Sequence, residues 1–529
     1  MKGERLRREY HQARWDEPII YEMSKEGVRG VLPPQPDEEI QSEIGDPLDD
    51  LPEEMRRDEA PDLPELSQKE VLMHYLHLSQ ETLGANLTED MSQATSTMKY
   101  NPRINEELVA SSEFASLHPR QPEDTVQGIL KIYYEMGEIL KELSGMDEVS
   151  FQAGGGSQAI HEGALMMRKY HKERGNFPEK DEIITTIFSH PSCAAAPEVA
   201  GFKVKTLYPG DDGLPKIEAL KSAISENTAG LFITNPEDIG IYNDRIDEFV
   251  DLVHEAGGLC FYDMANANAF LGIARAREAG FDICHFNLHK TFGSPHGCGG
   301  PGNGAVCTTD EMSKYLPVPL VHKDEDRYYL DFDLPKSIGK VRDFYGTASV
   351  VLRAYAWSRA VGLEGMREVA RVSNINNNYI YEKLAEIKGL DICYPDNDSR
   401  RMEQTRYSWE KLEEDTGVST DDVQRRVADF GIQHYWKSHH PWVIPQPMSV
   451  EPCETYTKED MDKYLELFEQ ISSEAYEDPE LVKNAPYKTA GFNLDDPSAL
   501  NDPERWALTW RAFLKKKDKI FGSEGGDKE

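Results

Sequence analysis

Apolar positions recur along the chain with two different spacings, and each spacing predicts a kind of element. From Asp124 to Leu143 they follow the period of an α-helix, and Gly145 ends the pattern. The same period predicts helices over residues 69–83, 245–255, 351–361 and 366–384. Short apolar runs bounded by turn residues predict strands over residues 183–188, 231–234 and 259–262. Strands that alternate with helices indicate a mostly parallel α/β sheet, which binds ligands at the carboxyl ends of its strands.

The regularity of this pattern divides the chain into parts. Residues 1–66 are polar, rich in acidic side chains and interrupted by prolines, which is typical of an extended arm. We expect a large α/β domain over residues 67–345 and a smaller α+β domain over residues 346–512. Residues 513–529 are predicted to form a charged tail.

Composition and charge narrow the class of protein. The 529 residues include 95 acidic and 58 basic side chains, a formal net charge of −37. Such a chain lacks the basic face that nucleic acids and anionic lipids require, so we expect neither as a partner. No segment has the length and hydropathy of a membrane span, and the N-terminus lacks the apolar core of a signal peptide. The seven scattered cysteines form no C-x-x-C pair, which predicts a reducing cytoplasm and no metal site.

The strongest chemical signal is Lys290, which follows His289 within the apolar segment Phe286–Phe292 and precedes a glycine-rich loop, Ser294–Gly302. A lysine shielded from water keeps more of its amine neutral, and a neutral amine forms an imine with an aldehyde. The glycines allow the backbone to approach a flat cofactor and its phosphate. A lysine taken alone is more often a surface charge, so the remaining pattern must decide.

Three further signals accompany this lysine. Asp263 follows a predicted strand, where a carboxylate would keep the ring nitrogen of pyridoxal 5'-phosphate (PLP) protonated; the alternative is a helix cap. The loop Gly154–Ser157 precedes an apolar-faced helix, whose free N–H groups attract phosphate, although such a loop is also a common turn. His190 follows another strand and would stack on the ring, although a lone histidine is more often structural. Together the four signals stand in the order that a fold type I PLP enzyme requires.

Several longer segments resemble one known family, subunit 2 of glycine dehydrogenase (decarboxylating), the P-protein of the glycine cleavage system. The likeness runs from about residue 15 to about residue 510, with its best-matched segments at Thr97–Pro102, Thr234–Pro236, Asn287–Phe292, Pro335–Gly339 and Glu451–Thr455. The resemblance implies an α/β fold of the PLP-dependent fold type I, aspartate aminotransferase-like. This fold has a large domain with a mostly parallel mixed sheet and a smaller C-terminal α+β domain.

The resemblance also implies the roles of individual residues. It implies PLP on Lys290, with His190 stacked on the ring and Asp263 at the ring nitrogen. The phosphate contacts would come from a second group of residues, Gly155, Gly156, Ser157 and His289. Thr347 stands where fold type I enzymes often lend a group across a subunit interface.

The activity implied by the resemblance is decarboxylation of glycine, with transfer of the aminomethyl group to the lipoyl group of H-protein. The implied partners are glycine dehydrogenase subunit 1, in a heterotetramer with two copies of each subunit, and the lipoyl-bearing H-protein. The amino-acid substrate would bind at the cofactor.

The chain departs from the family pattern in segments expected to line the substrate side of the site. The family's His-Gly-Thr-Asn-Pro reads His190-Pro191-Ser192-Cys193-Ala194, and its Met-His-Glu-Phe reads Met402-Glu403-Gln404-Thr405. One alternative is therefore a PLP-dependent paralogue that decarboxylates or transaminates a different amino acid. Another is a non-catalytic subunit that only stabilises a partner, although a subunit of that kind would have no need of Lys290 and Asp263.

Overall fold

The structure, a computed structural model, describes residues 9–32, 34–45, 47–57, 61–83, 91, 100–294, 302–432, 437–491 and 509–520. Two predicted segments lie outside these residues in whole or in part: residues 295–301 of the glycine-rich loop and residues 97–99 of the first family segment. The chain forms two compact units, Met1–Glu9 with Gly84–Asn484, and Tyr10–Leu83 with Ala485–Glu529. The domain boundaries at residues 66, 345 and 512 remain predictions.

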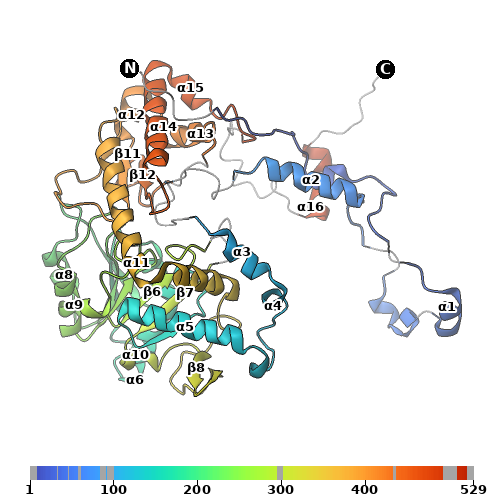
Figure 1. Cartoon of the computed structure of the whole chain (residues 1–529), viewed down its shortest axis with the longest axis horizontal. Helices are drawn as coiled ribbons and strands as arrows, with labels where there is room; N and C mark the ends of the chain where they lie inside the picture. The colour runs from blue at the N-terminus through green and yellow to red at the C-terminus, as the bar shows by residue number, and fades with distance from the viewer. Residues whose placement is uncertain are drawn as a thin grey trace. The chain divides into compact units, whose positions relative to one another are not determined.

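A seven-stranded mixed sheet with the order β1-β7-β6-β5-β4-β2-β3 lies at the centre of the first unit (Figure 1). The five strands from β3 to β6 in this order run parallel, whereas β7 pairs antiparallel with both β6 and β1. The strands are β1 (Glu148–Ser150), β2 (Glu182–Thr186), β3 (Lys203–Leu207), β4 (Thr228–Thr234), β5 (Leu259–Asp263), β6 (Ile283–Asn287) and β7 (Gly304–Thr308).

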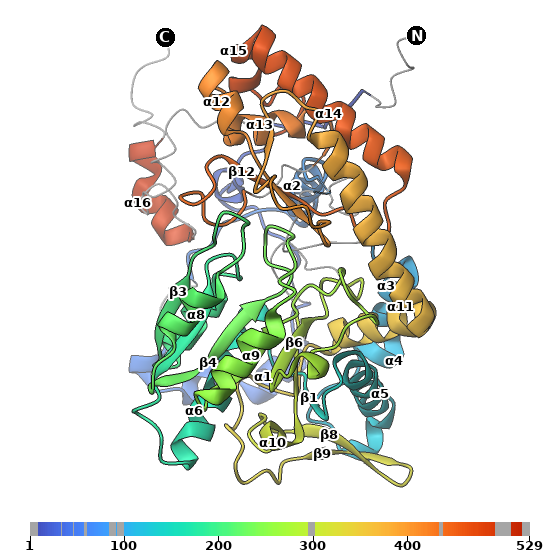
Figure 2. The ribbon, with the colours of Figure 1, turned by 90° about the vertical axis from the view of Figure 1, so that its left-hand side faces the viewer.

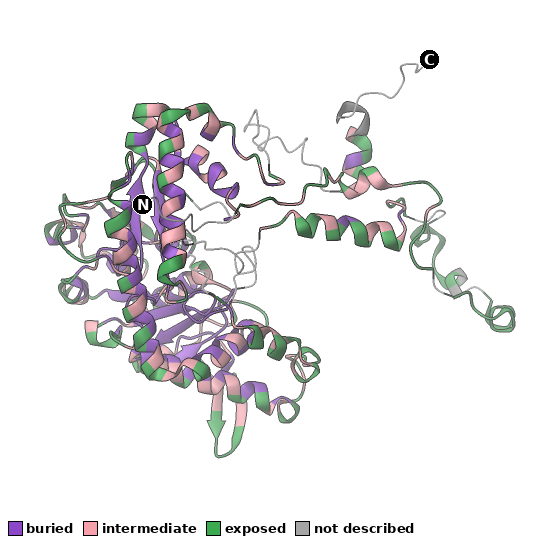
Figure 3. Cartoon of the chain, turned by 45° about the horizontal axis from the view of Figure 1, so that its top comes forward, coloured by how far each residue is buried: buried purple, intermediate pink, exposed green. Residues whose placement is uncertain are grey.

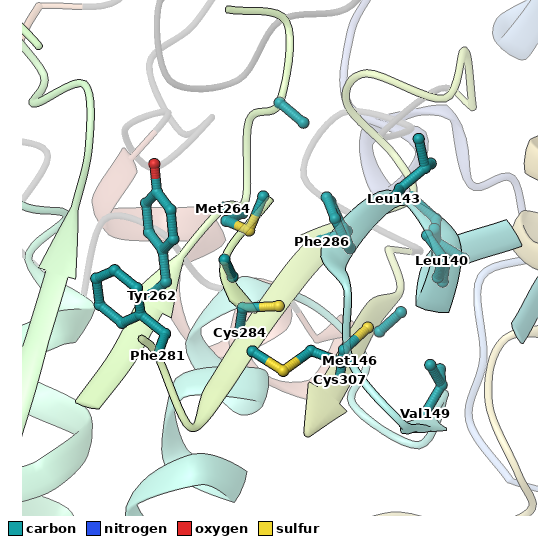
Figure 4. Packing of buried hydrophobic residues seen from close by; sticks show 14 of the residues in the cluster. Leu140, Leu143, Met146, Val149, Tyr262, Met264, Phe281, Cys284, Phe286 and Cys307 are labelled. Atoms are coloured by element: carbon teal, nitrogen blue, oxygen red, sulfur yellow. The ribbon is translucent and has the colours of Figure 1, made fainter. Parts of the chain in front are cut away.

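Helices cover both faces of this sheet because successive strand residues point to opposite sides. Cys260 and Tyr262 of β5 belong to one core cluster, whereas Phe261 between them belongs to the other. The first cluster includes side chains of α5 (Gln127–Ser144), α8 (Ile217–Ala223), α9 (Ile246–Glu255) and α11 (Ala348–Leu384). The second includes side chains of α6 (Gly156–Glu173) and α7 (Ser192–Val199). Figure 4 shows the first cluster, where the end of α5 packs against β5, β6 and β7.

The long helix α11 connects the sheet to a smaller α+β layer in the same unit (Figure 2). Gly362 interrupts α11 with a non-helical backbone (φ 69°, ψ 171°). Beyond Gly362, a three-stranded antiparallel sheet packs with four helices around a hydrophobic core of its own, separate from the two clusters of the central sheet. These elements are β10 (Asp391–Ile392), β11 (Thr405–Ser408), β12 (Pro447–Val450), α12 (Glu410–Thr416), α13 (Thr420–Ala428), α14 (Lys458–Glu477) and α15 (Pro479–Lys483).

The remaining elements are short. The first unit also holds α3 (Arg103–Ala110), α4 (Ser112–Ala115), α10 (Asp310–Ser313), the hairpin β8 (Leu320–Asp324) and β9 (Arg327–Asp331), and the 3-10 turns η6 (Glu123–Thr125) and η7 (Arg277–Ala279). The second unit holds η1 (Ile20–Met23), α1 (Glu38–Ile44), η2 (Pro47–Asp50), η3 (Glu53–Met55), α2 (Gln68–Gln80) and α16 (Trp510–Ile520). No helix in the described residues combines the length and the hydropathy that crossing a bilayer requires.

The fold confirms the predicted class, a mostly parallel mixed sheet with helices on both faces and a smaller C-terminal α+β part. Several boundaries differ from the sequence prediction, and two of them concern residues of the site. β2 ends at Thr186 and not at Phe188, and Asp263 is the last residue of β5 and not the first residue after it. The strands of the central sheet are largely buried, as Figure 3 shows, so side chains at their ends are positioned by a rigid scaffold.

Candidate active site

Lys290 lies in the turn directly after β6, at the carboxyl edge of the parallel strands. Its side chain is buried, with 7% of the residue exposed. The Lys290 N–H donates to the Asn287 carbonyl at 3.1 Å, and the Lys290 carbonyl accepts from the Gly293 N–H at 3.2 Å. These bonds fix the turn, so the strand, not a mobile loop, sets the position of the amine.

Asp263 ends the neighbouring strand β5, and its register partner on β6 is His285. The residue is 3% exposed, and its carboxylate is held on both sides. The Cys193 thiol donates to Oδ2 at 3.3 Å, and His285 Nε2 lies 3.5 Å from Oδ1. Burial opposes ionisation, but the electrostatic attraction of His285, His190 and Lys290 outweighs it and holds the pKa of Asp263 below its usual value. Asp263 is therefore a carboxylate at neutral pH.

His190 follows β2 and is a neutral imidazole at neutral pH. Burial lowers the pKa of His190 to about 4, and the charge of Lys290 acts in the same direction against the attraction of Asp263. The Ser192 N–H donates to Nδ1 at 3.1 Å, so the ring proton sits on Nε2. Because Lys290 and Asp263 both act on this imidazole, the three predicted residues lie around one site.

The predicted phosphate loop leads into α6, which begins at Gly156 after the N-cap Gly155. No side chain among the described residues caps this end of the helix, so its first N–H groups meet no side-chain acceptor there. A Cβ on Gly156 would lie 2.8 Å from Asn287 Nδ2, and Asn287 holds the Lys290 turn. Ser157 Oγ lies 2.5 Å from Ser192 Oγ, beside His190. The loop and the lysine turn are thus packed against each other.

Asn303 connects the two other predicted residues, His289 and Thr347. Its N–H donates to His289 Nδ1 at 3.1 Å, and its Oδ1 accepts from the Thr347 N–H at 2.7 Å. Its Nδ2 donates to the carbonyl of Phe151, just before the phosphate loop, at 3.1 Å. Thr347 is the N-cap residue of α11, and its Oγ1 accepts from Arg342 Nη1 at 3.0 Å. Sequence reasoning missed Asn303, because an asparagine after a glycine-rich loop is not distinctive.

A charged cluster from both layers of the unit lies beside His190 and was also missed. Asp238, after β4, and Arg406, in β11, form a buried pair with Nη2 3.3 Å from Oδ2. His439 Nδ1 lies 3.2 Å from the same oxygen, and its ring meets the His190 ring edge-on with centroids 5.3 Å apart. Although burial favours the neutral acid, the His439 hydrogen bond and the Arg406 charge hold the pKa of Asp238 below its usual value. Asp238 could have been predicted as a site residue, because it follows Asn235-Pro236, which ends a predicted strand.

One group of possible metal ligands lies elsewhere in the described residues: His254, Cys260 and Asp282, whose ligand atoms are within 4.8 Å of one another. These residues stand near the amino ends of β5 and β6, away from Lys290. Asp282 Oδ2 already accepts from the Cys260 N–H at 2.7 Å and lies 2.9 Å from His254 Nε2. These contacts explain why the three residues lie together: they link α9 to the central sheet.

The described residues fit PLP. A Cβ on Gly155 would meet no described atom within 4 Å, so this loop borders open space at a helix N-terminus suited to a phosphate. The buried carboxylate of Asp263 suits a protonated ring nitrogen, and the buried amine of Lys290 suits an aldehyde. A flat neutral imidazole, His190, lies near enough to Lys290 and Asp263 to feel the charge of both. An anion site, a cation site and an amine thus occur together at one edge of the sheet.

Comparisons with known proteins agree with this arrangement. The sequence pattern of the family Aminotransferase class-V, whose members depend on PLP, matches residues 91–416. The pattern of Glycine dehydrogenase, C-terminal domain, matches residues 369–487. Among solved structures, a crystal structure of glycine decarboxylase (P-protein) of the glycine cleavage system, in inhibitor-bound form, covers 83% of this chain and 99% of its own. At a TM-score of 0.69 and 22% identity, it shows the same fold.

Curated relatives match over nearly the whole chain. The probable glycine dehydrogenase (decarboxylating) subunit 2 of Thermococcus gammatolerans is 42% identical over 512 residues, which is 96% of this chain and 99% of the relative. The protein with the same description from Pyrococcus abyssi is also 42% identical over 512 residues, with the same coverage. That from Caldanaerobacter subterraneus subsp. tengcongensis is 40% identical over 492 residues, 92% of this chain and 98% of the relative. This chain belongs to the glycine dehydrogenase (decarboxylating) subunit 2 family.

Proposed function

We propose that this chain is the PLP-carrying subunit of a glycine dehydrogenase (decarboxylating). It decarboxylates glycine and transfers the aminomethyl group to the lipoyl group of a carrier protein, H-protein. The observation that carries the proposal is the convergence of Lys290, Asp263 and His190 at the carboxyl edge of one parallel sheet, in a chain of this family. The proposal includes a partner subunit 1, two copies of each subunit and a cytoplasmic location.

The chain's own residues have distinct tasks in this proposal. When bound, PLP supplies an electrophilic carbonyl carbon and an electron-withdrawing ring. Lys290 holds the cofactor covalently, and the Asp263 carboxylate keeps the ring nitrogen protonated. The Cys193 thiol and the Ala265 N–H donate to the two oxygens of that carboxylate and fix its orientation. His190 orients the ring from one face and, with its proton on Nε2, remains able to donate a hydrogen bond.

The remaining predicted residues bind and position. The N–H groups at Gly155, Gly156 and Ser157 hold the phosphate, with the helix dipole of α6 adding to the attraction. The His289 imidazole braces the chain behind the lysine through the Asn303 N–H. Thr347 stands at the start of α11, where it would lend a group to the cofactor across a subunit interface. Burial of Lys290 and Asp263 excludes water from the reacting groups.

The test of the cofactor assignment is Lys290→Ala. This variant should lose the visible absorbance of the bound cofactor while keeping the circular dichroism spectrum of the wild type. Lys323→Ala, in the hairpin β8–β9 and exposed, is the matched control and should keep the absorbance. An unchanged spectrum in Lys290→Ala would remove the assignment.

The substrate is tested by glycine–bicarbonate exchange with lipoylated H-protein and subunit 1. Wild-type protein should exchange the glycine carboxyl group with labelled bicarbonate, and Asp263→Ala should not. Exchange that needs no carrier would contradict the aminomethyl transfer. A cofactor spectrum that no amino acid changes would contradict the whole proposal.

A second candidate is a PLP-dependent enzyme for a larger amino acid, and a specific observation favours it. Glycine has no side chain, yet the site carries the charged cluster of Asp238, Arg406 and His439 beside His190. His439 is also partly open to solvent, with 36% of its side chain exposed. A panel of amino acids titrated against the cofactor absorbance separates the candidates. Turnover of a polar amino acid without glycine exchange would establish the second.

A further inference from the structure

Two carboxyl groups of the smaller α+β layer converge on the short loop that follows β5. Glu451, directly after β12, accepts from Asn266 Nδ2 and, at 3.2 Å, from Asn268 Nδ2. Glu403, just before β11, directs its carboxyl group to the N–H of Ala269 in the same loop. Both carboxyl groups therefore approach residues 266–269.

The loop joins these carboxyl groups to the lysine turn. Thr291, next to Lys290, donates from Oγ1 to Asn266 Oδ1 at 3.2 Å and accepts from the Ala267 N–H at 2.9 Å. Three charged groups act on Glu403: Glu451 after β12, Lys290 after β6, and Asp238 after β4. Glu403 is thus connected through this loop to the lysine turn and lies near enough to feel the charge of Lys290.

The conformation of Glu403 is tightly determined. Its N–H donates to Asn374 Oδ1 at 2.8 Å, and Asn374 Nδ2 donates to the Ala269 carbonyl at 2.8 Å. The backbone of Glu403 lies in the left-handed region (φ 54°), which residues other than glycine rarely adopt. The residue is 3% exposed, and its Oε2 has no hydrogen-bond partner in the described residues. The protein holds a buried carboxyl group with one oxygen left available.

Glu403 and Glu451 cannot both be ionised in a site that is so well shielded from water. Burial raises the pKa of Glu403 well above its usual value, and the charge of Glu451 adds to the rise against the attraction of Lys290. Glu451 is the better site for the negative charge, because two amide N–H groups donate to it. At neutral pH the proton of the pair therefore belongs to Glu403.

We propose that Glu403 is the proton donor of the group-transfer step, a role that rests on the proposed function. The electron pair left at the former α-carbon forms a C–S bond with one sulfur of the carrier's cyclic disulfide. The S–S bond breaks, its electron pair stays on the second sulfur, and that sulfur takes the proton of Glu403. The disulfide is reduced and the carbon is oxidised.

The protons of this step balance without another reagent. An amino acid enters as a zwitterion, and its ammonium group carries one proton more than the amine that leaves on the carrier. This is the proton that the new thiol gains. After transfer, ionised Glu403 stands beside Glu451, and the repulsion between the two charges draws the next proton from the incoming ammonium group.

The state of Glu403 is tested first without any reaction. The infrared spectrum of the full-length wild-type protein at neutral pH should contain the C=O stretch of a protonated carboxyl group. Glu403→Gln, which keeps the shape but carries no acidic proton, should lower the intensity of this band, and the remainder should come from Glu162 and Glu237, whose pKa values burial also raises. Glu226→Gln, at an exposed position, is the matched control and should keep the intensity of wild type. A band of the same intensity in Glu403→Gln and in wild type overturns the proposal.

The role of the proton is tested with two disulfide acceptors. With lipoylated H-protein, Glu403→Gln should transfer roughly 100- to 10,000-fold more slowly than wild type, the usual contribution of a general acid. Amino-acid binding, followed by the cofactor absorbance, should be unchanged. With an aromatic disulfide, whose leaving thiolate is stable without a proton, the defect should shrink to less than about tenfold.

The outcomes separate the two proposals. Equal slowing of Glu403→Gln with both acceptors means a structural role and overturns the donor assignment. A wild-type protein that transfers to neither acceptor overturns the proposed function and the donor role with it, whatever the infrared band shows. Because Glu403→Gln can disturb the strained backbone, Glu451→Gln provides a second variant. It removes the like charge, so the protonated-carboxyl band of Glu403 should titrate at a lower pH than in wild type.

Discussion

Glu237 should make the stability of this protein fall as pH rises through neutrality. It lies in the loop after β4, is 1% exposed, and its Oε1 has no hydrogen-bond partner in the described residues. Burial raises the pKa of Glu237 to about 8, with the charge of Asp238 adding to the rise and the Thr186 hydroxyl opposing it. The folded protein therefore keeps this carboxyl group neutral at pH 7, whereas the unfolded chain ionises it.

The magnitude follows from proton linkage. The pKa rises from 4.5 to about 8, which is about 3.5 units, and each unit corresponds to about 1.36 kcal/mol. The ionisation of Glu237 therefore lowers the free energy of unfolding by between about 3 and 5 kcal/mol. Below pH 4.5 both states hold the proton and nothing is lost. Between pH 4.5 and 8 only the unfolded state releases it, so the free energy of unfolding declines steadily and levels off above about pH 8.

Glu237→Gln removes the ionisable group with little change in shape. The variant should match wild type near pH 4.5 and become increasingly more stable than wild type toward pH 8. Urea-unfolding midpoints of both proteins at a series of pH values measure this difference, and the comparison cancels every other titrating group. Glu226→Gln, at an exposed position, should show no such trend. A difference between Glu237→Gln and wild type that stays constant with pH would refute the reasoning.

Two further substitutions probe how the smaller layer is held beside the site. Arg406→Met leaves the buried Asp238 carboxylate without its guanidinium and should cost about 3–5 kcal/mol in urea unfolding; the double variant with Asp238→Asn should recover most of this loss. Gly240→Ala should cost at least about 2 kcal/mol, because a Cβ there would lie 1.8 Å from the Gln404 carbonyl oxygen. Gly339→Ala has a similar positive φ and open space, so the excess loss in Gly240→Ala measures the steric part; equal losses would contradict this account.

Local spacing predicted most of the fold. The apolar period of α5 and its end at Gly145 were confirmed, because the left-handed Gly145 (φ 73°) stops the helix where the pattern stops. The predicted start at Asp124 was early, since Glu123–Thr125 form a 3-10 turn. The predicted end of β2 at Phe188 was also wrong. The Phe188 side chain is apolar because it packs against Ile239 and Ile241 in a separate cluster outside the sheet.

The cofactor end of the site could also be predicted from the sequence, because it too depends on local spacing. Lys290 and His190 each follow a parallel strand of one sheet and Asp263 ends another, and the carboxyl ends of such strands necessarily meet at one edge. Their arrangement follows from topology alone. The two flanking contacts of Asp263 were not predicted: Cys193 lies in α7, and His285 looks like one polar residue in an apolar strand.

The substrate side could not be predicted, because its partners are far apart in the sequence and no periodicity connects them. Asn266 and Glu451 are 185 residues apart, and Arg406 and Asp238 are 168 apart. These pairs form only when the smaller α+β layer packs on the loops after β4 and β5.

The two halves of the site therefore obey different constraints. Under the proposed function, substitutions in the strand ends should act on the cofactor, whereas substitutions in the segments before β11 and after β12 should change the substrate without disturbing the cofactor. The departures of Met402–Thr405 from the family pattern fall in such a segment, which is why the amino-acid panel, and not the cofactor spectrum of Lys290→Ala, decides between glycine and a larger substrate.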